Sequence, residues 1–499
     1  MCGIIGIVNY NYELKDFFSK IKELSHRGED GFGIFLDSCV YRFTDWQDLD
    51  LFVSENNSNY SFLAVHLLHS MVNYRPQPLI GEEGFLIANC EIYNWKELAQ
   101  KYDLVVENDA ELLLNLIENY GSSPSKLKKI LWQLDGDFAF SYFTDKKVIL
   151  SRDFVGVKPL FYNHLNDGSL HFASERKILP NKESSTPLYP GEILEYNLNS
   201  KQIKTVESDF LTSKNLLEKK TPSKSIDKLE LESSLKEKLE TAVLKRLPEN
   251  DVEVGVLFSG GIDSTLIAKI LKDNNIDFKC YTSHLTGRNI EEALDYNYAL
   301  EISKQLGLDL RVEEVNLEEL ESSIQEITDL LETSNYIKVS VALPLYFSLK
   351  KAREDNVKVI LSGLGAEELF AGYRRHMRAE DVTKECLEGL QILHDRDLYR
   401  DDLVSMKNNI EIRLPFLDLD LIDFSFKIPS EYKINKETNQ SKIILREVSE
   451  KFGLDKEFAW RKKKAAQYGS KFDKGILRLA KDKNETKQDY LLRFNKNMD

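Results

Sequence analysis

The segment VGVLFSGGIDSTLIAKIL, residues 254–271, decides the fold of the larger part of this chain. Apolar and β-branched residues before Ser259 predict a strand, and the apolar positions after Ser264 predict a helix. Between them, Gly260 and Gly261 allow a tight turn whose backbone N–H groups converge beside the positive end of the helix. Such a loop can hold phosphate groups.

Asp263 adds a carboxylate to this loop, although a carboxylate cannot itself attract a phosphate. Its position makes chemical sense if Mg²⁺ bridges it to a triphosphate, since this cation binds carboxylate and phosphate oxygens together. The alternative is a strand–helix turn in which the glycines serve packing and Asp263 caps the helix. The pattern lacks the ending of a Walker A loop. The full six-residue motif after a strand favours nucleotide binding.

Strands and helices alternate around this loop. Helices are predicted at 231–247, 264–272 and 292–307, and strands at 252–258, 278–285, 310–315 and 357–363. This alternation predicts an α/β, doubly wound parallel sheet, which binds ligands at the carboxyl ends of its strands. A second glycine-rich turn at such an end, SGLGAEELFAGY (362–373), would bring Ser362 and Glu367 to the same nucleotide and metal. The alternative is a capped helix N-terminus.

Residues 1 to about 200 have a different pattern. Short apolar strands alternate with helix-like patches such as 110–118, which predicts a layered α+β domain. Residues 200–226 are rich in lysine, serine and glutamate and predict a linker or a peripheral excursion of the chain. The last twenty or so residues are rich in lysine and asparagine and are expected to be loosely held.

The chain begins MCGIIGI, with a cysteine directly after the initiator methionine. Removal of Met1 would give Cys2 a free α-amine that can act as a general base for its own thiol. The alternative is that Cys2 is one more small apolar residue at the start of a strand. Taken alone, this stretch favours the structural interpretation.

Composition excludes several classes of protein. The net charge of −15 over 499 residues argues against nucleic acid or an anionic membrane as a partner. The 5 cysteines are scattered without CxxC spacing, which argues against a zinc site or a disulfide framework and favours a reducing compartment. The sequence shows neither a signal peptide nor an apolar run of about 18 residues. These features predict a cytoplasmic protein.

Seven separated motifs resemble those of glutamine-hydrolysing asparagine synthetases, in the family's order and over nearly the whole chain: MCGI, SHRGED, NCEIYN, SGGIDS, SGLGAEELFAGY, NNIEIRLPFLD and WRKKKAAQYGS. The resemblance implies an N-terminal-nucleophile glutaminase with αββα layers at residues 1–200 and an ATP-pyrophosphatase-type synthetase at 201–499. It also implies glutamine, aspartate and ATP as substrates, Mg²⁺ as cofactor, and a homodimer.

By this resemblance Cys2 attacks the glutamine amide, and the side chain of Asn89 with the N–H of Cys90 stabilises the oxyanion. Three further residues match positions around the glutamine: Asp109, Glu91 and Arg27. The two carboxylates would recognise the α-ammonium group. The arginine matches a framework residue beside the nucleophile, with a structural salt bridge as its alternative role.

In the second half, the resemblance makes Asp263 and Glu367 the carboxylates that bind Mg²⁺-pyrophosphate, while Lys463 would neutralise phosphate charge as an adenylate forms. The nucleotide would be bound by Leu257, Ser259, Gly260, Gly261, Asp263, Ser264, Ser362 and Gly363.

Two positions depart from the family pattern in ways that affect chemistry. Leu68 stands where an arginine usually binds the glutamine α-carboxylate, and leucine cannot form that bidentate pair, so Arg75 or another cation would have to replace it. Leu364 stands where a glutamate is thought to assist the attacking ammonia. Cys90 replaces a glycine but keeps the backbone N–H.

The sequence therefore predicts glutamine-dependent and ATP-dependent amidation of aspartate through β-aspartyl-AMP, releasing AMP, pyrophosphate and glutamate. One alternative is a related amide ligase that acts on another carboxylate; a cyclising version would have no use for Cys2. The other alternative is a catalytically silent regulatory protein, which Leu68 and Leu364 support.

Overall fold

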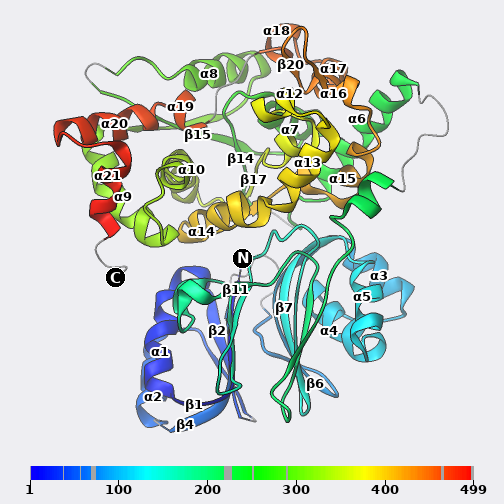
Figure 1. The fold of residues 1–499 in the computed structure, drawn as a ribbon, viewed down its shortest axis with the longest axis vertical. Coiled ribbons are helices and arrows are strands. Elements are labelled where there is room, and N and C mark those ends of the chain that lie inside the picture. The colour runs from blue at the N-terminus through cyan, green and yellow to red at the C-terminus, as the bar shows by residue number, and fades with distance from the viewer. Residues whose placement is uncertain are drawn as a thin grey trace. The chain divides into compact units, whose positions relative to one another are not determined.

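The structure is a computed structural model that describes residues 2–37, 39–56, 58–68, 75–218, 227–249, 252–287, 290–461 and 466–495. The chain divides into two compact units, Met1–Leu211 and Thr212–Asp499 (Figure 1). Each unit has its own sheets.

The first unit contains two antiparallel sheets. The seven-stranded sheet has the order β11-β9-β10-β1-β4-β2-β3. Its strands are β1 (Gly3–Glu13), β2 (Gly31–Leu36), β3 (Cys39–Phe43), β4 (Asn59–Leu68), β9 (Phe161–His164), β10 (Leu170–Ala173) and β11 (Thr186–Pro187). The six-stranded sheet has the order β13-β12-β8-β7-β6-β5. Its strands are β5 (Leu79–Ile80), β6 (Gly84–Ile92), β7 (Gly136–Thr144), β8 (Lys147–Arg152), β12 (Ile193–Asn197) and β13 (Ile203–Val206).

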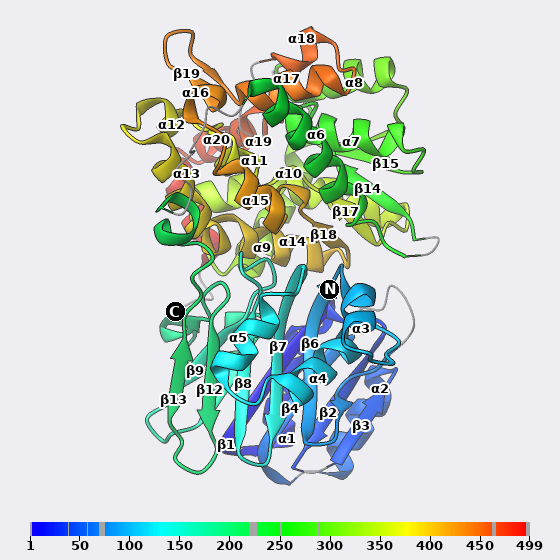
Figure 2. The same ribbon diagram turned by 90° about the vertical axis from the view of Figure 1, so that its right-hand side faces the viewer.

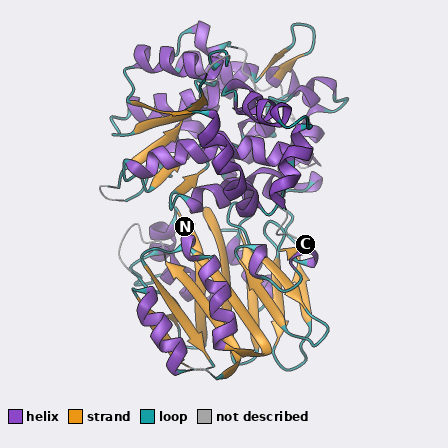
Figure 3. Cartoon of the chain, turned by 90° about the vertical axis from the view of Figure 1, so that its left-hand side faces the viewer, coloured by secondary structure: helices purple, strands orange, loops and turns teal. Residues whose placement is uncertain are grey.

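Helices cover the outer faces of these two sheets (Figures 2 and 3). On one side lie α1 (Leu14–Glu23) and α2 (Trp46–Glu55), and on the other α3 (Trp95–Lys101), α4 (Asp109–Tyr120) and α5 (Pro124–Leu131). Between the sheets, apolar side chains from both form one core, in which the rings of Phe85 and Phe143 stack with centroids 4.4 Å apart. The predicted αββα layering is confirmed.

Close packing in this core explains a glycine in the central strand β1. Gly6 lies opposite Phe172 of β10, and a Cβ atom at Gly6 would be 2.1 Å from Cζ of that ring. A larger residue at this position would displace the ring, and overpacking of this kind is destabilising.

The second unit is built on a five-stranded sheet of order β16-β15-β14-β17-β18, in which every pair is parallel. Its strands are β14 (Val254–Leu257), β15 (Lys279–Leu285), β16 (Leu310–Val315), β17 (Val359–Leu361) and β18 (Glu411–Arg413). The predicted doubly wound parallel sheet is therefore confirmed. A hairpin of β19 (Ile434–Asn435) and β20 (Gln440–Ser441) is separate from it.

Helices cover both faces of this sheet. The first are α6 (Lys228–Leu244), α7 (Ile262–Asp273), α8 (Leu294–Leu306), α9 (Leu317–Leu331), α10 (Tyr336–Glu354), α11 (Ala366–Leu369), α12 (Arg374–Arg378) and α13 (Val382–Gln391). The others are α14 (Tyr399–Lys407), α15 (Leu419–Ser425), α16 (Ser430–Lys433), α17 (Ile443–Lys451), α18 (Lys456–Ala459), α19 (Ala466–Gly469), α20 (Phe472–Asp482) and α21 (Lys487–Leu492). No helix in the described ranges is long and apolar enough to cross a membrane.

Neighbouring residues of β15 show which helices cover which face. Ser283 donates from Oγ to the carbonyl of Pro344 in α10 (2.7 Å), while the ring of His284 stacks on Tyr296 of α8 with centroids 4.2 Å apart. Because successive strand residues point to opposite faces, α8 and α10 lie on opposite sides of the sheet.

Two sequence expectations were wrong. The expected linker over 200–226 contains strand β13, which pairs with β12; as a short edge strand with two exposed residues it has little apolar signal. The C-terminal region, expected to be loosely held, forms α21, in which Tyr490 is 1% exposed and donates to Glu321 (2.8 Å). Contacts distant in sequence, which composition does not reveal, fix this helix.

One buried carboxylate organises a turn in the first unit. Asp153 is 2% exposed, and its Oδ1 accepts from the N–H groups of Val155, Gly156 and Val157 (3.1, 2.6 and 2.8 Å), while Oδ2 accepts from that of Lys158 (3.0 Å).

We predict that Asp153→Asn lowers the free energy of unfolding of this unit by about 2 to 3 kcal/mol, because it removes the charge and turns an amide N–H toward a backbone donor. The matched control is Asp167→Asn, an exposed turn carboxylate, which should cost less than about 1 kcal/mol. Tryptophan fluorescence during a urea titration reports this unit, since Trp46, Trp95 and Trp132 of the 4 tryptophans lie in it. Equal costs would contradict the prediction.

Candidate active sites

The first candidate site forms where the start of β1 meets β6. Cys2 is half-buried, and its backbone N–H donates to Oδ1 of Asn89 (3.1 Å). Asn89 is 1% exposed, and its Nδ2 has no hydrogen-bond partner among the described residues. A buried donor without a partner is costly. An oxygen that gains negative charge beside Cys2 would satisfy it, so the geometry suits an oxyanion.

Cys90 and Asp109 lie next to this pair. Burial, followed by the negative charge of Asp109 and the nearby Cys2, raises the pKa of the Cys90 thiol well above its usual value. Cys90 therefore stays protonated and does not compete as a second nucleophile. Asp109 begins α4 and accepts from the N–H of Ile92 (3.0 Å) in β6. Glu91 follows Cys90 in β6 and pairs in register with Asp137 of β7.

Arg27 packs beside the residue next to Cys2, the candidate nucleophile, and forms an ion pair with Glu175. A Cβ atom at Gly3 would be 3.1 Å from Cβ of Arg27, and the guanidinium, fully buried, donates from Nε to Glu175. Glu175 also contacts His26 (2.8 Å) and Lys177 (2.9 Å). Burial opposes its ionisation, but contacts with His26, Arg27 and Lys177 hold the pKa of Glu175 well below its usual range. This geometry favours the salt-bridge role for Arg27.

Leu68, which stands at the family's arginine position, and Arg75, the cation predicted to replace that arginine, lie in different environments. Leu68 ends β4, is 6% exposed and pairs in register with Gly31. Arg75 is paired with Glu107, and its Nε lies 3.7 Å from Oε1 of Glu111. A guanidinium therefore stands at the first turn of the helix that Asp109 begins.

The second candidate site lies where the strand order of the parallel sheet reverses. On one side of β14 come β15 and β16, and on the other β17 and β18, so the crevice that binds ligands in such sheets lies between the carboxyl ends of β14 and β17. The loops after these two strands touch, since a Cβ atom at Gly363 would be 2.7 Å from Cβ of Asp263. Leu257 is the last residue of β14.

A buried lysine joins the two predicted metal carboxylates. Nζ of Lys442 lies 2.8 Å from both carboxylate oxygens of Asp263 and 2.9 Å from Oε1 of Glu367. Lys442 is 3% exposed and caps α17 with a φ of 56°. Burial disfavours its charge, but Asp263 and Glu367 outweigh that effect and raise the pKa of Lys442. The sequence analysis missed this residue.

The backbone of the first loop has the conformation that the glycines allow. Gly260 has a φ of 62°, and a Cβ atom there would be 2.8 Å from the backbone N of Ala299 in α8. Gly261 caps α7, and its carbonyl accepts from Oγ of Ser264 (3.1 Å). The loop that starts at Ser259 leads from the carboxyl end of β14 into α7. The positive N-terminal end of α7 therefore faces the crevice.

Glu367 and Glu368 are adjacent in α11, after the second loop, but they contact different partners. Oγ of Ser362 accepts from the N–H of Leu364 (3.3 Å), and Leu364 is partly exposed rather than part of the core. Glu367 joins Lys442, whereas Glu368 is fully buried and pairs with Arg396. Burial, the largest influence, raises the pKa of Glu368 to about 7.

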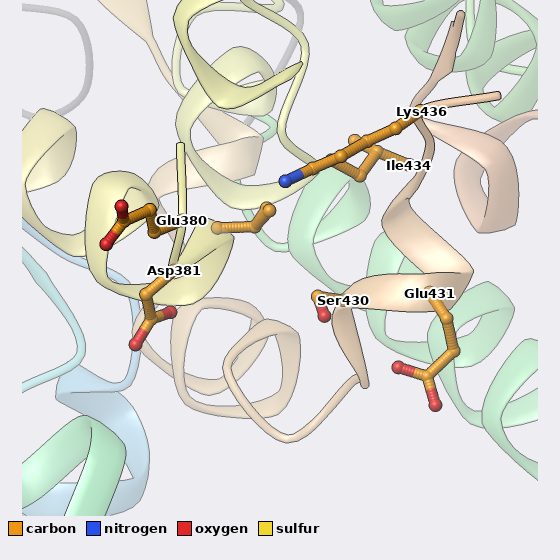
Figure 4. Close-up of a pocket in the computed structure, with 7 residues that line it drawn as sticks. Glu380, Asp381, Ser430, Glu431, Ile434 and Lys436 are labelled. Carbon is orange, nitrogen blue, oxygen red and sulfur yellow. The ribbon is translucent and has the colours of Figure 1, made fainter. Parts of the chain in front are cut away.

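Two other features bear on the extent of this site. Lys463 lies outside the described residues. A surface hollow in the same unit, shown in Figure 4, is lined by Glu380, Asp381, Val382, Ser430, Glu431, Ile434 and Lys436. It contains none of the residues predicted to bind nucleotide, so it forms no part of the site between the two loops.

Comparison with known proteins finds one family of domains for each part of the chain. A family model described as asparagine synthase matches residues 234–385 and 376–491, and one described as a glutamine amidotransferase domain matches 59–228. The chain is 32% identical to a putative glutamine-hydrolysing asparagine synthetase of Methanocaldococcus jannaschii, over 96% of each chain. The chain belongs to the asparagine synthetase family.

Relatives of lower identity also match over most of their length. The chain is 28% identical to the glutamine-hydrolysing asparagine synthetase of Gallus gallus, over 98% of this chain and 87% of that protein. It is also 28% identical to a probable asparagine synthetase of Dictyostelium discoideum, over 93% and 84% respectively. Family membership makes this chain a ligase with a glutamine amidotransferase domain, as the seven motifs predicted.

We predict that Lys442→Met lowers the free energy of unfolding by about 3 to 5 kcal/mol, because it leaves Asp263 and Glu367 close together without their cation. Lys474→Met is the control: this exposed lysine pairs with the exposed Glu291 and should contribute less than about 1 kcal/mol. Urea titration followed by circular dichroism measures both. A cost for Lys442→Met no larger than that of the control would show that the bridge does not hold the loops.

Proposed function

We propose that this protein makes asparagine from aspartate, with glutamine as the nitrogen donor and ATP as the energy source. The observation that carries the proposal is the meeting of Asp263, Glu367 and Lys442 between two loops at the reversal point of a parallel sheet. This arrangement joins a charged centre for phosphates to backbone N–H groups at a helix N-terminus. The cysteine site of the first unit would supply the ammonia.

In the first half-reaction, the thiolate of Cys2 bonds to the amide carbon of glutamine. The carbonyl oxygen becomes an anion, and Nδ2 of Asn89 and the N–H of Cys90 donate to it. The α-amine of Cys2, which has taken the thiol proton, gives that proton to the amide nitrogen, and ammonia leaves as the carbonyl reforms. Water then hydrolyses the thioester to glutamate. Asp109 and Glu91 would bind the glutamine α-ammonium, and Arg75, which contacts Glu111 in the first turn of α4, is a candidate for its carboxylate.

In the second half-reaction, a β-carboxylate oxygen of aspartate bonds to the α-phosphorus of ATP, and pyrophosphate leaves. Ammonia then bonds to the activated carbonyl carbon, and AMP leaves with one of the former carboxylate oxygens. The backbone of residues 259–264 and the ammonium of Lys442 would hold the phosphates. The side chain of Leu364 cannot accept a proton, so ammonia must arrive neutral or lose its proton to another group.

The carboxylates of this site fit a Mg²⁺ ion that the nucleotide helps to bind. Asp263 and Glu367 bring oxygens within 2.9 Å of one point, Nζ of Lys442. No cluster of three or more His, Cys, Asp or Glu side chains able to hold a metal occurs in the part of the chain that the structure describes. Two protein carboxylates completed by phosphate oxygens are a usual site for this cation, which would offset the charge of the departing pyrophosphate.

The function is tested by incubating the protein with ATP, Mg²⁺ and glutamine, adding candidate acids one at a time, and measuring pyrophosphate and amide products. We expect asparagine, AMP and pyrophosphate in equal amounts when aspartate is present. An amide of a different acid would identify a related ligase and contradict the proposal. Absence of nucleotide turnover with every acid would favour the regulatory alternative.

The proposal includes a homodimer, as the family resemblance implies, and a cytoplasmic location, as the composition predicts. Sedimentation velocity tests the assembly, and a single species with the mass of one chain would contradict it.

We predict that Cys2→Ala abolishes asparagine formation from glutamine but retains most of the activity with ammonium salts, because the variant removes the nucleophile of only one site. Cys39→Ala, which changes an exposed cysteine, is the control and should leave both activities unchanged. Loss of both activities in a folded Cys2→Ala protein would contradict the separation of the two reactions. Mass spectrometry that finds Met1 on the active protein would exclude the free-amine mechanism.

We predict that pyrophosphate binding to the parent protein needs Mg²⁺, and that Asp263→Asn and Glu367→Gln each weaken it at least about tenfold, since each removes one anionic metal ligand. Isothermal titration with pyrophosphate, with and without Mg²⁺, measures this effect. Glu291→Gln, an exposed carboxylate, is the control. Glutaminase turnover should be unchanged in all three variants. Metal-independent pyrophosphate binding would contradict the assignment.

A further inference from the structure

An arginine distant in sequence is bonded to the backbone of the phosphate loop. Arg461 follows α18, and its Nη1 donates to the carbonyl of Gly260 (2.5 Å). Its Nη2 donates to Oδ1 of Asp295 in α8 (2.8 Å), and its guanidinium lies 3.7 Å from the centroid of the Tyr298 ring. The side chains of Arg461 and Asp295 are 7% and 6% exposed. A buried guanidinium thus joins the loop to the helix beside it.

Gly260 contacts that helix directly as well as through the arginine. Its φ of 62° allows the loop to approach Ala299 so closely that a Cβ atom would be 2.8 Å from the backbone N. The carbonyl that Arg461 holds shares a peptide unit with the N–H of Gly261, the cap of α7. Donation to the carbonyl polarises the peptide and strengthens its N–H as a donor. The guanidinium therefore improves the loop as an anion-binding site.

A second arginine connects this contact to Lys442. Nη1 of Arg446 donates to the carbonyls of Ala459 (2.5 Å) and Arg461 (3.1 Å), and its Nε donates to that of Ser441 (2.8 Å). Ser441 immediately precedes Lys442, which holds both site carboxylates. Arg446 thus connects the backbone next to Lys442, which contacts both carboxylates, to the backbone of Arg461, which holds the loop.

We propose that Arg461 is a positioning residue, which holds the phosphate loop in the conformation that binds the triphosphate of the nucleotide. The inference rests on the proposed function only in taking the loop as the ATP site. An arginine is required because its planar fork donates to two acceptors at once while its face stacks on Tyr298. A lysine could reach Gly260 or Asp295 but could not reproduce this geometry.

The test compares Arg461→Lys with Arg311→Lys. Arg311 is also bidentate to an aspartate, with both contacts to Asp309 at 2.8 Å, but it is 43% exposed on β16 and outside the site. Pyrophosphate release is measured with saturating aspartate and ammonium while ATP is varied, and then with saturating ATP while aspartate is varied. Isothermal titration measures the affinity of each protein for a non-hydrolysable ATP analogue.

We expect Arg461→Lys to raise KM for ATP and Kd for the analogue about tenfold, the effect of losing one hydrogen bond to a charged group. Its kcat and KM for aspartate should change less than about twofold, and Arg311→Lys should match the parent. Asp295→Asn, which weakens the hold on the guanidinium, should change ATP affinity in the same direction by a smaller factor. It serves as the second variant if Arg461→Lys fails to fold.

Unchanged ATP affinity in folded Arg461→Lys, or in Asp295→Asn if the first variant does not fold, would overturn the inference. A parallel fall in kcat and in the affinities for both substrates would also overturn it, because it would indicate a purely structural role. Failure of the proposed function is distinguishable: if the parent releases no pyrophosphate with aspartate, the analogue titration still tests Arg461, since it requires no acceptor acid.

Discussion

The ammonium group of Lys442 between the carboxylates of Asp263 and Glu367 is the interaction on which the second unit's site depends. Two carboxylates held this close would repel each other and would be costly to bury without a partner charge. Lys442, the N-cap of α17, joins Asp263 in the first turn of α7, after β14, to Glu367 in α11, after β17. Folding therefore assembles a centre of two carboxylates and one ammonium group, with a net charge of −1, beside which a nucleotide and its cation can bind.

The candidate site of the first unit differs in the charge of the groups around Cys2. Its candidate site holds two neutral groups close to Cys2: the side-chain amide of Asn89 and a thiol at Cys90 that burial and Asp109 keep protonated. The buried charge of Glu175 is matched by Arg27 and Lys177, and His26 also contacts it. A negative charge that develops on a substrate oxygen therefore meets an unpartnered donor instead of a competing ion pair, as oxyanion stabilisation requires.

Local patterns in the sequence were enough to predict most of the architecture. The strand–loop–helix at residues 254–271 and the alternation after it gave the parallel sheet, since strands buried on both faces are continuous apolar runs. Strand β13 and helix α21 were missed because a partner strand and distant side chains stabilise them. Lys442 was missed for the same reason: in the polar segment NQSK it resembles an exposed lysine, and only the folded chain places it beside Asp263. Arg461 likewise lies in a basic run that predicts a solvated surface.

The central claim, that this chain activates an acid by transferring AMP to it, is tested most directly with aspartate labelled with ¹⁸O in its β-carboxylate. If the carboxylate attacks the α-phosphorus, mass spectrometry will find one ¹⁸O atom in the AMP for each asparagine formed. Label in inorganic phosphate, with ADP as the nucleotide product, would show phosphoryl transfer from the other end of ATP and would contradict the account.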